Sequence, residues 1–348
     1  MTLRSESLHV PTHEEVVSFS DDDVGLRSVI AVHSTALGPA LGGTRFHPFA
    51  FVDDAVTDVL RLSEAMTRKN SLADLDFGGG KAVIIGDPAV DKRPELLRAY
   101  GQAVCALEGR YVTAEDVGTT PADMDVIATV CSHVTGTSAA SGDPSVATAR
   151  GVHGAQAAVV RRMSGGSFEG CHVAVMGAGK VGSLLVESLI ASGARVSVAD
   201  VRQEAVAALA DRHGTETCRV VGVEEILTQS CDLLAPCALG GVLDSAVVGS
   251  LRCRAIVGAA NNQLGDDSVA DELAAAGVLY VPDFVVNAGG VINLAQEAGG
   301  YDARDAERRT DAIADTVADL LDEADARNVT PLAAALERAR RRVNAAGR

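Results

Sequence analysis

Tryptophan is absent from this sequence, and aromatic residues make up only 3% of its 348 residues. Proteins that hold single-stranded nucleic acid commonly stack its bases on aromatic side chains, so the chain lacks that kind of platform. Its formal net charge of −17 also opposes binding to nucleic acid or to an anionic membrane surface. We therefore expect no nucleic acid and no membrane among its partners.

Long hydrophobic runs are missing too. No apolar run approaches the ~18 residues that a membrane-spanning helix needs, and the opening residues MTLRSESLHVPTHEE lack the apolar core of a signal peptide. The seven cysteines show no CxxC spacing, which argues against a disulfide framework and against a zinc site. These absences predict a cytoplasmic protein that holds no metal.

Lysine is scarce as well, because only four of the 30 basic residues are lysines and the remaining 26 are arginines. Two of the four, Lys69 and Lys81, frame a stretch that ends in Gly78-Gly79-Gly80. Arginine stays charged at any working pH, whereas burial can push a lysine amine toward neutrality. Three glycines would let a small molecule approach the backbone. We interpret the stretch as a candidate site; the alternative is a glycine turn between two surface lysines.

The chain length favours two domains, and the first part mixes short strands with helices and glycine-rich segments. Apolar spacing predicts its elements. In chain order they are a strand over 28–33, a glycine-rich turn over 39–45, an amphipathic helix over 53–66 that runs into Lys69, a strand over 82–85, a helix over 94–107, and a strand over 111–114 with its exit loop over 115–120.

A Gly-, Ser- and Pro-rich loop over 136–144 marks a domain boundary, and a helix over 146–163 follows it. Beyond this point short apolar strands alternate with helices, which predicts a parallel, doubly wound α/β sheet. The expected strands are 171–176, 195–199, 219–221, 233–235, 255–257 and 278–281, and the expected helices are 180–192, 204–212, 223–228 and most of 304–336, with a new helix starting at Pro331.

The second part also carries a dinucleotide-binding fingerprint, GAGKVG, which spans Gly177, Ala178, Gly179, Lys180, Val181 and Gly182. It follows an apolar strand directly and opens a helix, and Asp200 ends the next strand 23 residues after the first glycine. The first glycine permits a tight turn, the second lets a pyrophosphate approach, and the third allows close helix–strand packing. Asp200, next to Val201, would bind ribose hydroxyls and repel a 2′-phosphate, which favours NAD; Arg202 leaves NADP open.

A nicotinamide enzyme needs a proton acceptor at the reacting carbon and a group that fixes the substrate. Of Lys69 and Lys81, a protonated one would bind a carboxylate and the other could act as general base. Asp116, in a strand-exit loop, is a candidate proton-relay or amine-binding carboxylate; the alternative is a loop-capping role.

Three asparagines follow apolar strands of the second part: Asn261, Asn262 and Asn287. The carboxyl ends of such strands bind ligands in doubly wound folds, although asparagine also suits ordinary turns. Cys237 and Ala238 lie in the motif APCALGG, and no histidine pairs with this cysteine in sequence. We interpret both residues as lining the cofactor site rather than as nucleophilic.

Taken together, these residues resemble the amino-acid dehydrogenase family that includes the glutamate, leucine, valine and phenylalanine dehydrogenases. The resemblance covers nearly the whole chain and is strongest to the valine and leucine members. The motifs that carry it are GPALGGTR (38–45), MTRKN (66–70), FGGGKAVIIGDP (77–88), GRYVTAEDVGT (109–119), GDPSVATARGV (142–152), GAGKVG (177–182), APCALGG (235–241), GAANNQL (258–264) and PDFVVNAGGVIN (282–293).

The resemblance implies an α/β fold of two domains with an active-site cleft between them. Residues 1–140 would form the substrate and oligomerisation domain, and 141–327 a Rossmann-type, doubly wound NAD-binding domain. A C-terminal helix over about 328–348 would pack back on the first domain. The implied reaction is reversible, NAD-dependent oxidative deamination of an L-amino acid to a 2-oxo acid and ammonia, carried out by a homo-oligomer.

The resemblance also implies roles for individual residues. Lys69 would bind the substrate carboxylate, Lys81 would be the base, and Asp116 would assist proton transfer. Gly42, Gly43, Asn262 and Asn287 would hold the substrate, with Thr148 at the nicotinamide amide, and Leu41, Ala114, Val291 and Leu294 would line the side-chain pocket. Because these four are apolar, a branched-chain substrate is expected, with a phenylalanine enzyme as the alternative. A catalytically silent binding protein is a further alternative, opposed by the intact Lys69, Lys81 and Asp116.

One residue departs from the family pattern, which usually has a small residue where this chain has Asp74. On the surface this carboxylate would be harmless. Facing Lys69 or Lys81, it would stabilise the protonated amine and oppose base function.

Overall fold

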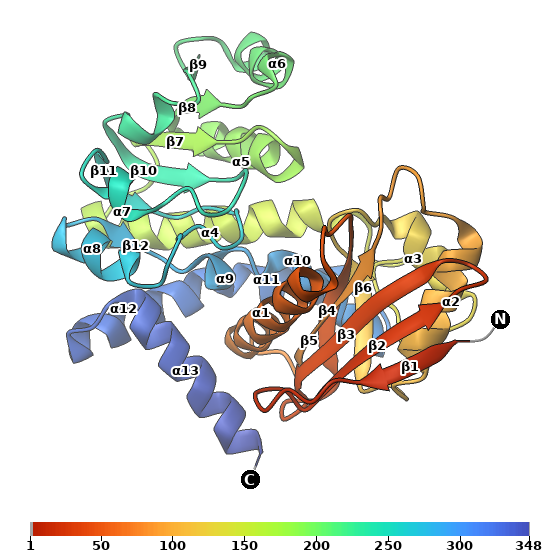
Figure 1. The fold of residues 1–348 in the computed structure, drawn as a ribbon. Coiled ribbons are helices and arrows are strands. Elements are labelled where there is room, and N and C mark those ends of the chain that lie inside the picture. Colours follow the sequence, from red (N-terminus) through yellow and green to blue (C-terminus); the bar gives the residue numbers. More distant parts are fainter. Residues whose placement is uncertain (1–2, 348) are drawn as a thin grey trace. The chain divides into compact units, whose positions relative to one another are not determined.

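The computed structural model describes residues 3–347 and divides into two compact units. The first unit comprises residues 1–143, 293–303 and 338–348, and the second comprises residues 144–292 and 304–337. Each unit has its own six-stranded sheet with helices packed against it. The predicted two-domain α/β fold is thereby confirmed (Figure 1).

The sheet of the first unit has the strand order β1-β2-β3-β5-β4-β6. Its first four strands pair antiparallel, whereas β4 runs parallel to both of its neighbours, β5 and β6. The bounds are β1 (Arg4–Ser7), β2 (Glu15–Asp21), β3 (Leu26–Ser34), β4 (Ala40–His47), β5 (Gly78–Ile85) and β6 (Tyr111–Glu115). The strands expected at 28–33, 82–85 and 111–114 are therefore present, each somewhat longer than predicted.

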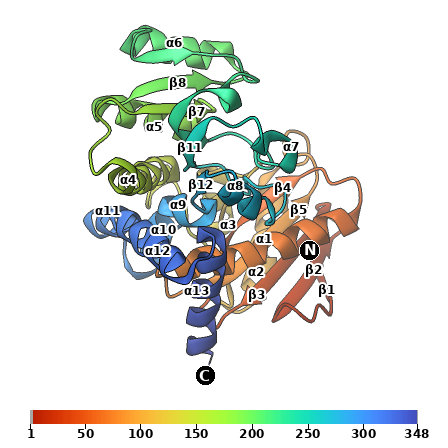
Figure 2. The same ribbon diagram turned by 90° about the vertical axis from the view of Figure 1, so that its left-hand side faces the viewer.

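Helices cover both faces of this sheet, with α1 (Val52–Leu72) on one face and α2 (Pro94–Cys105) with α3 (Pro121–Ala128) on the other (Figures 1 and 2). Neighbouring strand residues point to opposite faces. Val83 of β5 accordingly packs with the buried residues of α1, and Ile84 with those of α2. Lys81 shares the register of Val83, so its side chain belongs to the α1 face.

Both glycine-rich motifs of this unit are strands, and the turn predicted over 39–45 is wrong. The glycines are required because other parts of the chain approach them closely. A Cβ on Gly42 would lie 1.8 Å from the Gly80 carbonyl oxygen, one on Gly79 would lie 2.1 Å from the Thr67 nitrogen, and one on Gly80 would lie 2.7 Å from the Tyr111 ring. The space beside Gly79 and Gly80 is thus filled by the protein, not open to a small molecule.

The sheet of the second unit is entirely parallel, with the order β12-β11-β10-β7-β8-β9. The chain builds outward from β7 in one direction and then returns to β10 on its other side, which is the switch point where doubly wound sheets bind ligands. The bounds are β7 (His172–Met176), β8 (Arg195–Ala199), β9 (Cys218–Val220), β10 (Cys231–Pro236), β11 (Cys253–Ile256) and β12 (Leu279–Tyr280). This confirms the parallel, doubly wound prediction.

The remaining helices are mostly those expected. They are α4 (Pro144–Ser164), α5 (Lys180–Ala191), α6 (Gln203–His213), α7 (Ser245–Val248), α8 (Val269–Ala275), α9 (Asp283–Val286), α10 (Gly289–Ala295), α11 (Ala303–Asp311), α12 (Ile313–Arg327) and α13 (Pro331–Ala346), with the 3₁₀ turns η1 (Ile226–Thr228) and η2 (Gln296–Gly299). The helix predicted over 223–228 is wrong, since only η1 forms. So short a segment offers too few hydrogen bonds to offset the cost of nucleating an α-helix.

The last helix, α13, is divided between the units: its residues up to Glu337 belong to the second and those from Arg338 to the first. Within the first unit, Ser71 Oγ donates a hydrogen bond to the Ala339 carbonyl at 3.2 Å, which ties α1 to this helix. In the part of the chain described here, no helix combines the length and apolar character required to span a membrane.

We expect Gly79→Ala to lower the free energy of unfolding by roughly 2 kcal/mol or more, because its Cβ would overlap backbone rather than a movable side chain. Urea unfolding followed by circular dichroism measures this change. Gly249→Ala is the matched control, since Gly249 has a φ of −66° and no atom within 4 Å of an added Cβ. Equal effects of the two substitutions would contradict the packing argument.

Candidate active site

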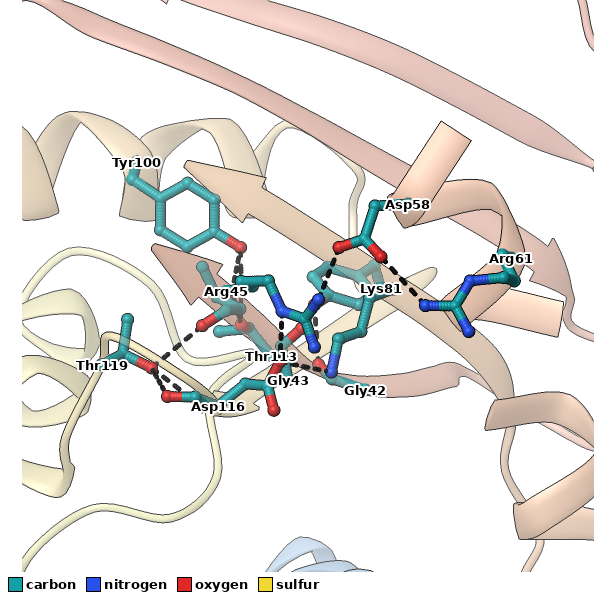
Figure 3. A network of polar contacts seen from close by, with 12 residues as sticks. Gly42, Gly43, Arg45, Asp58, Arg61, Lys81, Tyr100, Thr113, Asp116 and Thr119 are labelled. Atoms are coloured by element: carbon teal, nitrogen blue, oxygen red, sulfur yellow. Dashed lines mark hydrogen bonds and ion pairs between the residues drawn. The ribbon is translucent and has the colours of Figure 1, made fainter. Parts of the chain in front are cut away.

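A buried ion pair joins Lys81 and Asp116 in the first unit, with Lys81 Nζ 2.8 Å from Asp116 Oδ2 (Figure 3). Their side chains are 8% and 22% exposed. Lys81 lies in β5 and Asp116 directly follows β6, and these two strands flank β4. Gly43 of β4 makes the approach possible, because a Cβ there would lie 2.9 Å from Asp116 Cβ. Two of the three predicted catalytic residues are therefore brought together.

Asp116 is ionised in this setting. Burial acts to raise the pKa of its carboxyl group, but the charges of Lys81 and Arg45 outweigh burial and hold the pKa below the ordinary value for aspartate. Its loop is also held by Thr119, whose Oγ1 accepts from the Asp116 backbone nitrogen at 2.8 Å. The carboxylate faces the two cations and also accepts a hydrogen bond from the backbone of Val117.

Two further residues of this network, Arg45 and Asp58, were not predicted as site residues from the sequence. Arg45 of β4 places Nη1 2.6 Å from Asp58 Oδ2 and Nε 3.5 Å from Asp116 Oδ2. Asp58 lies on α1 and also pairs with Arg61 at 3.2 Å. The feature of the sequence that could have indicated this network is Arg45, a charged residue at the end of the motif GPALGGTR.

Lys69 lies in the last turn of α1 and is half-buried. The adjacent Asn70 is fully buried, and its Nδ2 donates to the carbonyls of Leu41 at 3.2 Å and Gly78 at 2.6 Å. Asn70 thereby fastens the end of α1 to both β4 and β5. The sequence motif MTRKN thus combines the candidate substrate-binding lysine with the residue that anchors its helix.

Asp74 is on the surface, with its side chain 91% exposed and Oδ1 3.2 Å from Arg342 Nη2 of α13. Its φ of +53° places it in the left-handed region where the chain turns out of α1. Arg342 also donates through Nη1 to the carbonyls of Ser71 at 3.0 Å and Leu75 at 2.9 Å. The departure from the family pattern therefore belongs to a cap at the end of α1.

In the second unit, the fingerprint GAGKVG forms the turn between β7 and α5. A Cβ on Gly177 would lie 2.9 Å from Ala238 Cβ, and one on Gly182 would lie 1.9 Å from the Gly177 oxygen. Gly179 differs, because it has a φ of −74° and the nearest atom to an added Cβ is Arg202 Nη2 at 4.0 Å. The absence of a side chain at Gly179 leaves room in front of the α5 N-terminus, as a pyrophosphate would require.

Asp200 closes the other side of this turn. Its Oδ2 accepts from the Ala178 nitrogen at 2.6 Å and its Oδ1 from the Arg202 nitrogen at 2.8 Å. Burial acts to raise the pKa of this carboxyl group, but these backbone donors outweigh burial and lower it. The Arg202 guanidinium also donates to the Ala178 carbonyl at 3.1 Å, while Val201 is exposed. The predicted carboxylate is thus fixed beside the glycine turn.

The asparagines form a second polar group in this unit. Asn287 Nδ2 donates to the Ala259 carbonyl at 3.0 Å and to Asn261 Oδ1 at 2.8 Å. Asn287 Oδ1 is buried and accepts no hydrogen bond within the described chain, which leaves an acceptor for a ligand. The Asn262 side chain is exposed. The Asn262 backbone nitrogen donates to Asp283 Oδ2 at 2.6 Å, and the residue has a φ of +52°.

Cys237 and Ala238 pack against the glycine turn, since Cβ atoms added at Gly182 and Gly177 would lie 3.4 Å and 2.9 Å from the Cβ atoms of Cys237 and Ala238, respectively. Burial raises the pKa of the Cys237 thiol to about 12, so the group is not a thiolate at neutral pH. Thr148 lies in α4, where its Oγ1 donates to the Pro144 carbonyl at 2.9 Å.

Three of the four predicted pocket residues, Leu41, Ala114 and Leu294, belong to the first unit and are buried. Leu41 lies on β4 and Ala114 on the neighbouring β6. Leu294 lies near the end of β6, since a Cβ on Gly136 would be 3.1 Å from Leu294 Cδ2 and 3.8 Å from the Glu115 nitrogen. Val291, also buried, is part of the second unit.

A parallel sheet with an open glycine turn, accompanied by a second α/β unit with a buried Lys–Asp pair, has the features expected of a two-domain dehydrogenase. The sequence model of the protein family Glu/Leu/Phe/Val dehydrogenase, dimerisation domain, matches residues 13–133. The model of the Glutamate/Leucine/Phenylalanine/Valine dehydrogenases matches residues 141–348. The chain belongs to this family, as its sequence motifs predicted.

Individual relatives agree with this assignment. The chain is 48% identical to a valine dehydrogenase of Streptomyces virginiae, over 93% of its own length and 91% of the relative's. It is 44% identical to a leucine dehydrogenase of Bacillus subtilis, over 86% and 83% of the two chains. Among solved structures, L-tryptophan dehydrogenase from Nostoc punctiforme matches with a TM-score of 0.84 and 37% identity, over 96% and 97%.

We expect Asp74→Asn to change the free energy of unfolding by less than ~1 kcal/mol and turnover by less than about twofold, because an exposed ion pair contributes little. Arg342→Ala should cost more, roughly 1–3 kcal/mol, since it also removes the donor to the carbonyls that end α1. Urea unfolding and steady-state turnover measure both effects. A severe loss of turnover in Asp74→Asn alone would contradict the placement of this carboxylate.

Proposed function

We propose that this chain catalyses the reversible, NAD-dependent oxidative deamination of a branched-chain L-amino acid to its 2-oxo acid and ammonia. The observation that carries the proposal is the buried Lys81–Asp116 ion pair beside the glycines of β4, in a member of this dehydrogenase family. The identities of 48% and 44% to a valine and a leucine dehydrogenase support the branched-chain substrate class.

In this proposal Lys69, still protonated, binds the substrate carboxylate, and the backbone of Gly42 and Gly43 lies along the substrate. NAD, when bound, supplies the acceptor for the hydride that leaves Cα, so that the amine is oxidised to an imine. Lys81 takes a proton from the water that adds to the imine carbon and returns it to the nitrogen of the resulting carbinolamine. Ammonia then leaves as the hydroxyl group loses its proton and becomes the carbonyl of the 2-oxo acid. Asp116 stays ionised beside Lys81 and accepts a hydrogen bond from the amine.

The residues of the second unit fit NAD. The room beside Gly179 and the N-terminus of α5 suit a pyrophosphate, and the Asp200 carboxylate suits ribose hydroxyls. The buried, unpaired Asn287 Oδ1 offers an acceptor, with Asn261 and Thr148 proposed beside it at the nicotinamide. Lys180 and Val181 open α5, and Cys237 and Ala238 line the turn.

We further propose that the protein acts as a homo-oligomer in the cytoplasm. The match to a dimerisation domain supports the assembly, and seven free cysteines suit a reducing compartment. A substrate with an aromatic side chain is a second candidate, supported by the similarity to an L-tryptophan dehydrogenase. The buried aliphatic residues Leu41, Ala114 and Leu294 favour the branched-chain class.

We expect Asp200→Asn to weaken NADH binding by about tenfold and to strengthen NADPH binding, because the change removes the charge that repels a 2′-phosphate while Arg202 stays nearby. Fluorescence titration of each reduced cofactor measures binding without turnover. The amide keeps the size of the side chain and one acceptor. Unchanged affinity for both cofactors would contradict the assignment of Asp200 to the ribose.

We expect the enzyme to form NADH with valine, leucine and isoleucine, and more slowly with phenylalanine, tryptophan and glutamate. Lys81→Ala should lower kcat by roughly 10²–10⁴-fold, the usual contribution of a general base, and should leave NADH binding intact because Lys81 lies in the first unit. Absorbance of NADH follows turnover, and fluorescence follows binding.

Preference for an aromatic substrate would retain the chemistry and overturn the substrate class. Binding of NADH without oxidation of any amino acid would point to the silent binding protein instead.

A further inference from the structure

Five side chains of alternating charge form a continuous series on the α1 face of the first sheet (Figure 3). The order is Lys81, Asp116, Arg45, Asp58 and Arg61, with successive N–O distances of 2.8, 3.5, 2.6 and 3.2 Å. The groups come from β5, the β6 exit loop, β4 and α1. Lys81 and Arg45 face Asp116 directly, whereas Asp58 and Arg61 act on it only through Arg45.

Arg45 holds the central place in this series. Its side chain is 24% exposed, compared with 57% for Arg61, and it alone of the two reaches both carboxylates. A guanidinium group keeps its charge at any working pH, whereas an amine that serves as a base must lose its charge during the reaction. When Lys81 becomes neutral, Arg45 is the cation that still faces Asp116.

The contact between Arg45 and Asp116 is not yet a full hydrogen bond. Arg45 Nε and Asp116 Oδ2 are both buried and lie 3.5 Å apart; Nε has no hydrogen-bond partner within the described chain, whereas Oδ2 already faces Lys81 Nζ at 2.8 Å. An N–O separation of about 2.7–2.9 Å would make the Arg45 contact a charge-assisted hydrogen bond as well. A shift of less than ~1 Å would complete it.

We propose that Arg45 is a positioning residue: held by Asp58 of α1, it fixes the Asp116 carboxylate and takes over as its partner when Lys81 gives up its proton. This inference rests on the proposed role of Lys81 as base. It assigns Arg45 no contact with substrate, because its effect passes through Asp116.

A purely structural alternative must be separated from this proposal, because the pair with Asp58 also joins β4 to α1. Arg61→Gln is the matched control, since it removes a second cation from the same Asp58 without reaching Asp116. Asp58→Asn breaks the join between β4 and α1 but leaves the charge of Arg45 near Asp116. Arg45→Lys keeps a positive charge but loses the forked guanidinium group that reaches the carboxylates of both Asp58 and Asp116.

The kinetic test compares the kcat and KM of amino-acid oxidation. Arg45→Gln should lower kcat about tenfold or more, with the KM for NAD changed less than about twofold. Arg45→Lys should recover part of kcat, and Arg61→Gln should stay within about twofold of the wild type. Equal kinetics for Arg45→Gln and Arg61→Gln would overturn the proposal and leave the proposed function intact.

A second measurement does not depend on turnover. The pKa of Asp116 lies below that of ordinary aspartate, so the stabilisation it receives is present above the unfolded pKa and is lost as the pH falls through the folded one. In a protein that already carries Asp58→Asn, Arg45→Gln should therefore lower the urea concentration at the midpoint of unfolding at pH 7. This decrease should disappear below about pH 4. A coupling that does not change with pH would refute the link to Asp116, even if the wild type oxidised none of the amino acids.

Discussion

The structure of the first unit depends on placing an ammonium group and a carboxylate together, largely shielded from water, beside one sheet. Removing such charges from water is costly unless they are paired closely and in a fixed geometry. Lys81 and Asp116 meet across an intervening strand, and the glycines of β4 leave the space for them to do so. Gly79 and Gly80 in turn let α1 and Tyr111 press against β5. The unusual run of glycines is thus a packing requirement of one ion pair and its surroundings.

The sequence predicted the second unit more fully than the first, for a physical reason. Strands of a parallel sheet are buried on both faces and appear as short apolar runs, and the turn GAGKVG is defined by its own residues. In the first unit, the sequence predicted a turn around Gly42 and an open approach at Gly80, because glycine favours turns locally. The strands that form there need glycine because atoms of other elements lie close to both residues. The pairing of Arg45 with Asp58 likewise joins a strand to a helix, which no periodicity in the sequence reveals.

The rarity of lysine is a partial guide to chemistry. Arg45 and Arg342 occupy positions where a permanent, forked donor spans several acceptors, and these positions suit arginine. An arginine in place of Lys81 could not serve as the proposed base. Lys92, however, pairs with Asp123 at 2.8 Å and donates to the Gly118 carbonyl at 3.1 Å, which is a structural role. The small number of lysines therefore reduces the candidates for a reactive lysine but does not identify it.

The cap that Arg342 places on the end of α1 has a consequence for the order of folding during synthesis. The first unit contains residues 1–143 and also residues 338–348, so it is discontinuous along the chain. Domains that are continuous can fold as they emerge from the ribosome. Here the donor to the carbonyls of Ser71 and Leu75 follows the whole second unit along the chain. The candidate catalytic unit is therefore completed only after the second unit has been made.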